Sequence, residues 1–468
     1  MDLWIHWYGA IRQLRPGFSR ELTFLWFTLS VAGLSVRTDK LGISSIVRAL
    51  SLAPSRSYQR LLKNCRSDGI NLTRLRSLWS ASVMRLFASR IERVNGRPVL
   101  IADGKKVAKS GKKMPGVKLL HQESDSNTKP SFIMGHSTGA ISMLANAASS
   151  VLAVPLDIQI HEGVIFSNRD KRTLLDKALL QLAELNIAEP CYLVADAFYA
   201  SGKIVKGALK QNHDLITRCK TTCVAYHKAP KVKNPGRGRP RKYGKPVVLT
   251  NLFRSAVAVS TVESPLYDDT NVMLKVRSID LLWKPASRIV RFVLVEHPTR
   301  GRWILMCSDL SLAPIDVIRL YGLRFKIEYG FKQAAHVIGT FDYHFWMMNM
   351  KPLKRGNGNQ YMHKESPEYR RDVRAKLHTY HVHLFMGVVT QGLMHYLSAC
   401  HTDLVWRSFG SWLRTIRKGV APSERVVALA MRNTLDEFLI VGCASNSIAK
   451  FIIEKQCRGN TQALSEAA

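Results

Sequence analysis

Four residues near the centre of the chain have the chemistry and the spacing of a phosphate-handling site. They are Tyr321, Arg324, Glu328 and Lys332, in the stretch APIDVIRLYGLRFKIEYGFKQAAHVI. Apolar residues recur there at helical spacing, which predicts one helix over residues 313–338. The four side chains then share one stripe of that helix. A carboxylate flanked by Arg and Lys could hold a metal ion beside a phosphate. An exposed charged face with ordinary ion pairs is the alternative.

Two aspartates could complete such a site. Asp103 follows the apolar run 99–102, and Asp196 follows the apolar run 192–195. Runs of this kind are typical of buried strands, so we expect a strand to end at each aspartate, at a sheet edge where sites open. Two such carboxylates and Glu328 could chelate two Mg²⁺ ions about 3.5–4 Å apart, an arrangement that drives phosphoryl transfer. Oxygen ligands suit Mg²⁺.

The pattern Y-x2-R-x3-E, formed by Tyr321, Arg324 and Glu328, resembles the signature of the Y-R-E-K group of bacterial insertion-sequence transposases. These are cut-and-paste DDE enzymes. The resemblance extends to the order and separation of Asp103, Asp196 and Glu328. It also extends to the long insert between the second Asp and the Glu, and to the length of the chain.

This resemblance covers about residues 98–338 and implies an α/β fold, with an RNase H-like core of the retroviral-integrase type and a β-rich insert. It implies that Asp103, Asp196 and Glu328 are both the catalytic residues and the ligands of two Mg²⁺ ions, which Mn²⁺ can replace. The implied partners are double-stranded DNA with terminal inverted repeats, target DNA, and a second copy of the chain in a homodimer on DNA.

Several further DNA-binding residues are implied by the same resemblance. Arg324, with Tyr321 beside it, would hold the phosphate chain near the cut. The family's Lys falls seven residues after the Glu, where this chain has Ala335, and Lys332 on the same stripe is the candidate replacement. Trp303 precedes a short apolar strand, where the family has a Trp that stacks on a flipped base during hairpin formation. A Trp packed in the core of the insert is an equal alternative.

Composition narrows the class of partner. The chain has 468 residues with 46% hydrophobic residues and a net charge of +35. This balance favours a polyanion, nucleic acid first and an anionic membrane second. No apolar run reaches the ~18 residues of a spanning helix, and no signal peptide is recognisable. The eight cysteines are scattered, which suits a reducing cytosol. With the resemblance, we expect a bacterial cytoplasmic protein associated with the nucleoid, without a membrane partner.

Five segments are expected along the chain: a helical DNA-binding region at 1–95, the first part of the core at 96–219, a basic and β-rich insert at 220–311, the second part of the core with the catalytic Glu helix at 312–375, and a helical C-terminal region at 376–468. Periodicity predicts the further strands 117–121, 131–143, 214–219, 272–283, 288–297 and 302–310, and the helices 168–185 and 201–211.

The pattern of residues 41–65 predicts two helices joined by a turn. The first helix would cover 43–50, and Ser55 would cap the second. Arg56, Arg60 and Lys63 would then lie on one side of the second helix, where they could touch phosphates or base edges. An ordinary basic helical hairpin is an equal alternative.

Two basic stretches could also bind DNA. Six lysines fall between positions 105 and 118, beginning with Lys105 and Lys106, and could form a phosphate-binding loop or a solvated turn. Arg237 and Arg239 lie in R-G-R-P, which resembles an AT-hook core and could enter a narrow minor groove. A disordered basic linker is the alternative, slightly favoured.

The sequence therefore leads to one main hypothesis, a DDE transposase that cleaves transposon ends and transfers the freed 3′-hydroxyls to target DNA. The first alternative is a structure-specific nuclease of the same fold, which cuts without joining strands. The second is a non-catalytic, basic DNA-binding regulator derived from a transposase. Metal-dependent nicking would separate the regulator from the enzymes, and strand-transfer products would separate the transposase from the nuclease.

Overall fold

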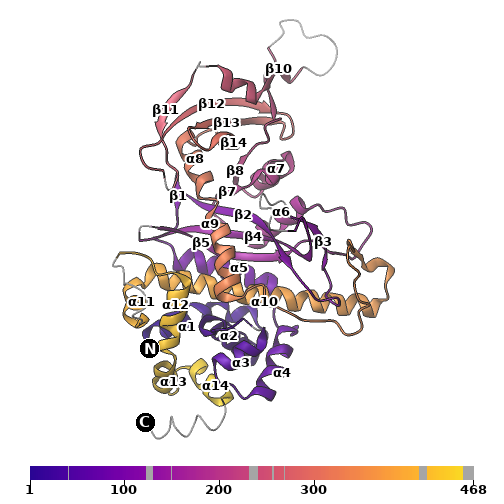
Figure 1. Cartoon of the computed structure of the whole chain (residues 1–468), viewed down its shortest axis with the longest axis vertical. Helices are drawn as coiled ribbons and strands as arrows, with labels where there is room; N and C mark the ends of the chain where they lie inside the picture. Colours follow the sequence, from indigo (N-terminus) through magenta and orange to yellow (C-terminus); the bar gives the residue numbers. More distant parts are fainter. Residues whose placement is uncertain are drawn as a thin grey trace.

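The computed structural model describes residues 1–456 apart from 41, 123–129, 149, 231–240, 256–257, 268 and 411–418. The fold is mixed α/β, as predicted, with one large mixed sheet and many helices. Figure 1 shows three levels: helices from both ends of the chain at the bottom, the centre of the sheet in the middle, and a β-rich part at the top.

Five strands form the centre of the sheet, in the order β5-β4-β2-β7-β8. They are β2 (Arg97–Ala108), β4 (Phe132–Ala147), β5 (Ser150–Ile160), β7 (Tyr192–Ala195) and β8 (Asp214–Arg218). β4 pairs antiparallel with both β2 and β5, whereas β7 runs parallel to β2, and β8 runs parallel to β7. Helix α6 (Leu174–Glu184) lies between β5 and β7 in the sequence, and α7 (Gly202–Lys210) lies between β7 and β8.

Two predictions about this part of the sheet were wrong. β2 does not end at Asp103, because it continues through Ala108 in register with β4, where Lys105 pairs with Thr138. Lys105 and Lys106 therefore lie on a strand rather than in a phosphate-binding loop. The strand β5 was not predicted, since Pro155 interrupts its apolar run; it is accommodated at a register shift opposite Ser142.

The predicted strands of the insert are confirmed as β12 (Met273–Trp283), β13 (Arg288–His297) and β14 (Gly301–Cys307). β14 pairs antiparallel with β8, so the insert continues the central sheet. The remaining strands are β1 (Arg93–Val94), β3 (Lys118–His121), β6 (Val164–Ile165), β9 (Val224–Lys228), β10 (Tyr243–Val248), β11 (Ser260–Glu263) and β15 (Gln360–Tyr361).

Helices from the two ends of the chain pack together. The N-terminal helices are α1 (Asp2–Ile11), α2 (Glu21–Val36), α3 (Ile43–Ala49), α4 (Pro54–Cys65) and α5 (Leu72–Leu86); the C-terminal helices are α10 (Pro367–Cys400), α11 (Thr402–Phe409), α12 (Glu424–Asn433), α13 (Leu435–Gly442) and α14 (Ser447–Lys455). Trp4 stacks on Phe438 at a ring distance of 5.3 Å, and α10 contacts α2, α5 and β5. Among the described residues, no helix combines the length and apolar character that crossing a bilayer requires.

Helix starts were predicted less well than helix positions. α4 begins at Pro54 with Ala53 as its N-cap, so Ser55 lies inside the first turn and does not cap it. α6 begins at Leu174 rather than at 168, because Thr173 and Asp176 form a capping box. α7 begins where predicted, after the N-cap Ser201.

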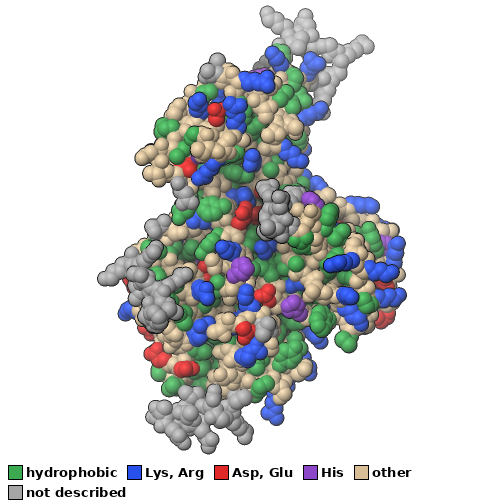
Figure 2. Space-filling model, in the orientation of Figure 1, with side chains coloured by type: hydrophobic (Ala, Val, Ile, Leu, Met, Phe, Trp, Pro, Cys, Tyr) green, Lys and Arg blue, Asp and Glu red, His purple; other side chains and the backbone are tan. Residues whose placement is uncertain are grey.

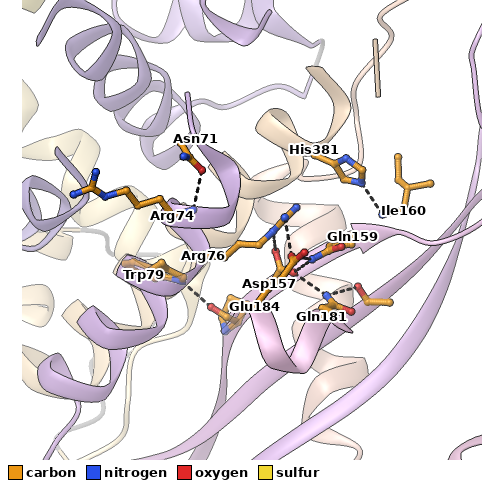
Figure 3. Close-up of polar contacts among 12 residues, drawn as sticks. Asn71, Arg74, Arg76, Trp79, Asp157, Gln159, Ile160, Gln181, Glu184 and His381 are labelled. Carbon is orange, nitrogen blue, oxygen red and sulfur yellow. Dashed lines mark hydrogen bonds and ion pairs between the residues drawn. The ribbon is translucent and has the colours of Figure 1, made fainter. Parts of the chain in front are cut away.

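A buried polar network fastens the helical level to the sheet (Figure 3). Arg76 on α5 donates to Asp157 on β5 at 3.0 Å and to Glu184 on α6 at 2.9 Å. Gln181 donates to the other oxygen of Asp157 at 3.0 Å and to the backbone carbonyl of Gly139. Because Arg76 and Asp157 are both buried, the ion pair fixes how α5 sits on β5.

Candidate active site

Asp103 and Asp196 occupy equivalent positions on adjacent parallel strands. The last pair between β2 and β7 joins Ala102 to Ala195, and each aspartate is the next residue. Parallel strands lie about 4.8 Å apart, so the two carboxylates originate from neighbouring points of one edge. The prediction that β7 ends immediately before Asp196 is confirmed.

The same row continues onto β8. Ala195 pairs with Thr217, which places Arg218 beside Asp196. Arg218 is exposed and was not predicted as a site residue. Its place depends on the register of β8 with β7, which no local pattern of the sequence reveals.

Local contacts orient the two aspartates. The backbone N–H of Gly104 donates to Asp103 Oδ1 at 2.7 Å. Asp196 Oδ1 accepts from the N–H of Phe198 at 3.1 Å and so caps the short 3₁₀ turn over Ala197–Tyr199. The backbone carbonyl of Asp196 accepts from Thr217 Oγ1 at 2.6 Å. Both carboxylates are therefore positioned by fixed backbone rather than by a mobile loop.

The segment that carries Glu328 is not the single α-helix that we predicted. It forms α8 (Pro314–Leu323), α9 (Lys326–Gln333) and a π-helical turn over Ala334–Ile338, which ends at Gly339 with φ of +71°. Between α8 and α9 the backbone tightens, because the N–H of Arg324 donates to Tyr321 and that of Ile327 donates to Arg324, both three residues back. The helix axis is thereby interrupted at Arg324.

Arg324 joins the helix to the sheet. Its Nη1 lies 2.9 Å from Asp103 Oδ2, and its Nη2 lies 2.7 Å from Glu328 Oε1. The predicted stripe is therefore present for Arg324 and Glu328, which form an i,i+4 pair. The guanidinium thus links Glu328 to Asp103. Burial lowers the pKa of Arg324, but Asp103, Tyr321 and Glu328 outweigh that effect and raise it.

The carboxylates repel one another. Burial raises the pKa of Asp103 to about 6; Arg324 and the Gly104 N–H oppose that change, and the charges of Asp196 and Glu328 add to it. The phenol of Tyr199 is buried beneath the same edge, and its pKa is raised by burial and then by Asp103 and Asp196. The charges of Asp196 and Glu328 therefore act on Asp103, and a cation bound beside Asp103 would offset them.

The fit to a metal ion follows from this donor set. Asp103, Asp196 and Glu328 supply the carboxylate oxygens that Mg²⁺ and Mn²⁺ prefer, and a cationic group already lies between two of them. Within the ranges that the structure describes, no three His, Cys, Asp or Glu side chains lie close enough together to form a metal-binding group. The residues fit a metal ion in chemistry, while Arg324 holds Asp103 and Glu328 on its own nitrogens.

Of the three lysines predicted near the site, Lys105 lies on the same face of β2 as Asp103, whereas Lys106 and Lys332 are exposed. Lys105 shares the Asp103 face of β2, with its amino group 5.5 Å from the ring centre of Phe331 and 5.8 Å from that of Phe341. Lys106 points to the other side of the strand and is exposed. Lys332 is exposed on α9 and forms no ion pair with Glu328, although both residues are described.

A cavity of about 360 Å³ opens beside Arg324. It is aromatic and basic; its walls are Arg218, Leu266, Tyr267, Arg300, Trp303, Tyr321, Gly322, Arg324 and Phe325. Trp303 is half-buried, and its ring centre lies 5.8 Å from that of His297. The structure thus brings together Trp303, Tyr321 and Arg324, three residues that were predicted separately.

The remaining predicted residues lie elsewhere. Arg56 and Arg60 are exposed on α4, together with Lys63, while Leu61 and Cys65 face the helical core. Arg237 and Arg239 lie outside the described residues. Figure 2 shows Lys and Arg side chains over all three levels of this face of the molecule, so the basic character is not confined to one patch.

Comparison with known families identifies the superfamily of the chain. The family model described as DDE superfamily endonuclease matches residues 13–273, more than half of the chain. The chain therefore belongs to the DDE superfamily endonuclease family. The matched region contains Asp103 and Asp196 and ends before Glu328, so the third acid is assigned from the structure and from the motif. No curated protein matches the sequence.

Proposed function

We propose that this protein is a DNA transposase of the Y-R-E-K group of insertion-sequence enzymes, which cleaves transposon ends and transfers their 3′-hydroxyls to target DNA. The observation that carries the proposal is that Asp103 and Asp196 follow paired residues of two adjacent parallel strands, and that Arg324 joins Asp103 to Glu328. Membership of the DDE superfamily endonuclease family supports the nuclease chemistry. The Y-x2-R-x3-E motif supports the narrower group.

An RNase H-like core is part of this proposal. Its support is the strand order β5-β4-β2-β7-β8, with three antiparallel strands followed by two parallel ones and a helix before each of the parallel strands. Asp103 lies on the central strand of this set, and Asp196 follows its neighbour. The β-rich insert at 220–311 and the helical regions at 1–95 and 376–468 would surround that core.

Asp103, Asp196 and Glu328 would hold two Mg²⁺ ions, or Mn²⁺ in their place. When bound, such ions activate the attacking oxygen and stabilise the leaving oxygen of an in-line displacement. Arg324 would leave its two carboxylates and turn to a phosphate oxygen, to which a guanidinium binds in a two-pronged fashion. Lys105 would neutralise a neighbouring phosphate from the same face of β2.

The DNA partner is proposed from charge and exposure. A net charge of +35 suits a chain that covers a long duplex. Arg56 and Arg60 on α4 would contact the terminal inverted repeat, and Lys106 the DNA backbone near the cut. Arg237 and Arg239 would reach a minor groove. Two copies of the chain would pair the two transposon ends.

The test uses supercoiled DNA carrying the inverted repeats that flank the coding sequence. Asp103→Asn, Asp196→Asn and Glu328→Gln should each lower Mg²⁺-dependent cleavage by at least about a thousandfold, while DNA binding stays near the wild-type level. Asp214→Asn, which changes a carboxylate at the opposite end of β8, is the matched control. If one of the three variants cleaves normally, that residue is not a ligand.

The products separate the alternatives. Joined strand-transfer products support the transposase, and cleavage without joining supports a nuclease of the same fold. Binding without any metal-dependent cleavage would support a regulator that has kept the fold.

A further inference from the structure

The segment between the π-helical turn and β15 presents large apolar side chains to solvent. Its residues alternate over 341–348: Phe341, Tyr343, Phe345 and Met347 are buried, whereas His344, Trp346 and Met348 are exposed. Trp346 is 60% exposed and Met348 is 83% exposed, the two largest values among the exposed large apolar residues of the described chain. An exposed Trp two residues from an exposed Met forms an apolar projection of the kind that marks an interaction site.

This segment is held rigidly although it has no regular secondary structure. Two buried lysines donate to its backbone carbonyls: Lys109 to Phe341 and to Tyr343 (3.1 Å), and Lys376 to Trp346 at 2.8 Å. Burial lowers the pKa of both amino groups to about 8. The buried amino groups of Lys109 and Lys376 therefore hold the backbone of residues 341–346 in place.

Further contacts complete the anchoring. Tyr380 Oη donates to the carbonyl of Phe345 at 2.8 Å, and Lys113 Nζ donates to that of Met348 at 3.0 Å. The N–H of Met347 donates to the carbonyl of Lys113 at 2.9 Å. The exposed pair is thus held from α10 on one side and from the loop after β2 on the other. Such a rigid apolar projection loses little conformational entropy when it binds.

Glycine at position 111 lets the indole lie against that loop. A Cβ added to Gly111 would stand 2.9 Å from Trp346 Nε1 and 2.6 Å from the sulfur of Met114. The indole of Trp346 can therefore lie this close to the backbone only because residue 111 has no side chain. Gly111→Ala would displace the indole without removing it.

The surroundings of the pair are basic. Lys112, Lys351, Lys354 and Arg355 are all exposed in the two segments that carry or hold it. The nearby acid Asp372 accepts a hydrogen bond from Asn349 at 2.7 Å. Figure 2 shows Lys and Arg side chains gathered along the right-hand edge of the molecule, where Figure 1 draws the orange loops beside β3. An apolar projection within a basic surface suits duplex DNA better than an apolar protein surface.

The anchoring lysine Lys109 gives a scale for the distance between the pair and the carboxylates. Lys109, which anchors the segment, is six residues beyond Asp103 along the same strand direction. At about 3.3 Å per residue, Lys109 lies roughly 20 Å from Asp103, which is the length of about six base pairs of duplex. Lys105 lies between the two places, on the Asp103 face.

We propose that Trp346 and Met348 form a wedge that enters the minor groove of duplex DNA about six base pairs from the cut and kinks it. Apolar side chains that part a base step in this way exchange stacking energy for a bend that brings more DNA onto the protein. The wedge rests on the proposed DNA-cutting function, but it concerns binding and bending, which are measured without cleavage.

The experiment uses the full chain without divalent metal and a blunt duplex ending in the flanking inverted repeat. Trp346→Ala and Met348→Ala together should weaken binding about tenfold at fixed salt, reduce the bend seen by energy transfer between labelled duplex ends, and leave the salt dependence of affinity unchanged. 2-Aminopurine placed at each step should brighten about six base pairs from the end, and only with Trp346 present. Gly111→Ala should reproduce the loss, whereas Trp346→Phe should restore most of the bend.

Two further variants serve as controls for charge and for position. Lys351→Ala with Lys354→Ala should weaken binding and flatten the salt dependence, and Val441→Ala on α13 should change neither. Wild-type affinity and bending in the double variant, in a protein that still cleaves, would overturn the wedge and leave the proposed function intact. If the double variant loses bending and the wild-type protein shows no cleavage, the wedge would be supported and the proposed transposase function would be contradicted. A brightening that needs single-stranded DNA would overturn the duplex wedge.

Discussion

The guanidinium of Arg324 lies 2.9 Å from the carboxylate of Asp103. The same group holds Glu328 at 2.7 Å. We infer that Arg324 would compete with a metal ion for these two carboxylates, and that it would be free to bind phosphate once such an ion was bound.

Arg324→Gln should accordingly tighten Mn²⁺ binding and slow cleavage. Removal of the positive charge frees Asp103 and Glu328, so the dissociation constant measured by calorimetry without DNA should fall about tenfold, equivalent to about 1.4 kcal/mol. Cleavage should fall by about a hundredfold or more, because a donor to the reacting phosphate is lost. Arg319→Gln, on the same helix but paired with Glu92, is the control. Unchanged or weaker Mn²⁺ binding would show that the guanidinium does not compete with the ion.

Trp303→Ala should affect a late step and spare the first one. The half-buried indole lines a cavity of about 360 Å³ with Arg324, and base stacking on such a face is worth roughly 1–3 kcal/mol. On a pre-nicked transposon end, hairpin formation should fall about tenfold or more, while first-strand nicking persists. Trp303→Phe should recover much of the loss. An equal loss of both steps with a lower melting temperature would mean that Trp303 only supports the insert.

Arg76→Met should be among the more destabilising single changes. It leaves Asp157 buried at 1% exposure without its ion-pair partner, and such removal costs about 3–5 kcal/mol of unfolding free energy. Urea denaturation followed by circular dichroism measures the loss. The double variant Arg76→Met, Asp157→Leu should be more stable than the single one, because no buried charge is left alone. Arg48→Met, which breaks an exposed pair with Asp39, should cost less than about 1 kcal/mol.

The stability of the protein should fall as the solution is acidified below about pH 6.5. Burial, with a smaller contribution from nearby cations, lowers the pKa of His136 and of His383 to about 3, although a backbone hydrogen bond opposes the change in each. Between about 6.5 and 3 the unfolded chain binds a proton on each imidazole while the folded chain does not, so protonation favours unfolding. Each histidine should contribute a slope of about 1.4 kcal/mol per pH unit.

His383→Gln isolates this effect. Its unfolding free energy is measured in urea at pH 7.5 and at pH 5.5. Between these two values it should fall by about 1.4 kcal/mol less than that of the wild type, because the variant lacks the uptake of one proton on unfolding. His121→Gln, at an exposed position of β3, should keep the wild-type dependence. Identical slopes for His383→Gln and the wild type would show that His383 takes up its proton in the folded state.

Local patterns of the sequence predicted the local structure around the candidate site well. The apolar runs before Asp103 and Asp196 gave two neighbouring parallel strands, and the spacing of Arg324 and Glu328 gave their i,i+4 contact. Contacts between distant segments could not be predicted this way. The pair of Arg324 with Asp103, separated by 221 residues, depends on how α9 packs on β2.

The incorrect predictions have similar causes. Asp103 was placed at a strand end because Gly104 and the lysines after it resemble a loop, yet a long partner strand keeps them extended. The proline in β5 concealed a central strand, and the tight turns at Arg324 arise from backbone contacts that apolar periodicity does not report. Arg218 joins the row of Asp103 and Asp196 only through strand register.

Because β14 pairs with β8 through Leu305, Met306 and Cys307, the upper β-rich part and the strands that precede Asp103 and Asp196 belong to one continuous sheet. A hinge between them would require breaking those pairs. The distance from the β9–β10 hairpin to the carboxylates is therefore fixed by the sheet. DNA that touches both places must supply the flexibility itself. Cleavage should then depend on the helical phase of the DNA: an insertion of about five base pairs between the two contacts would turn the second one to the wrong side of the duplex, and an insertion of a full turn would bring it back.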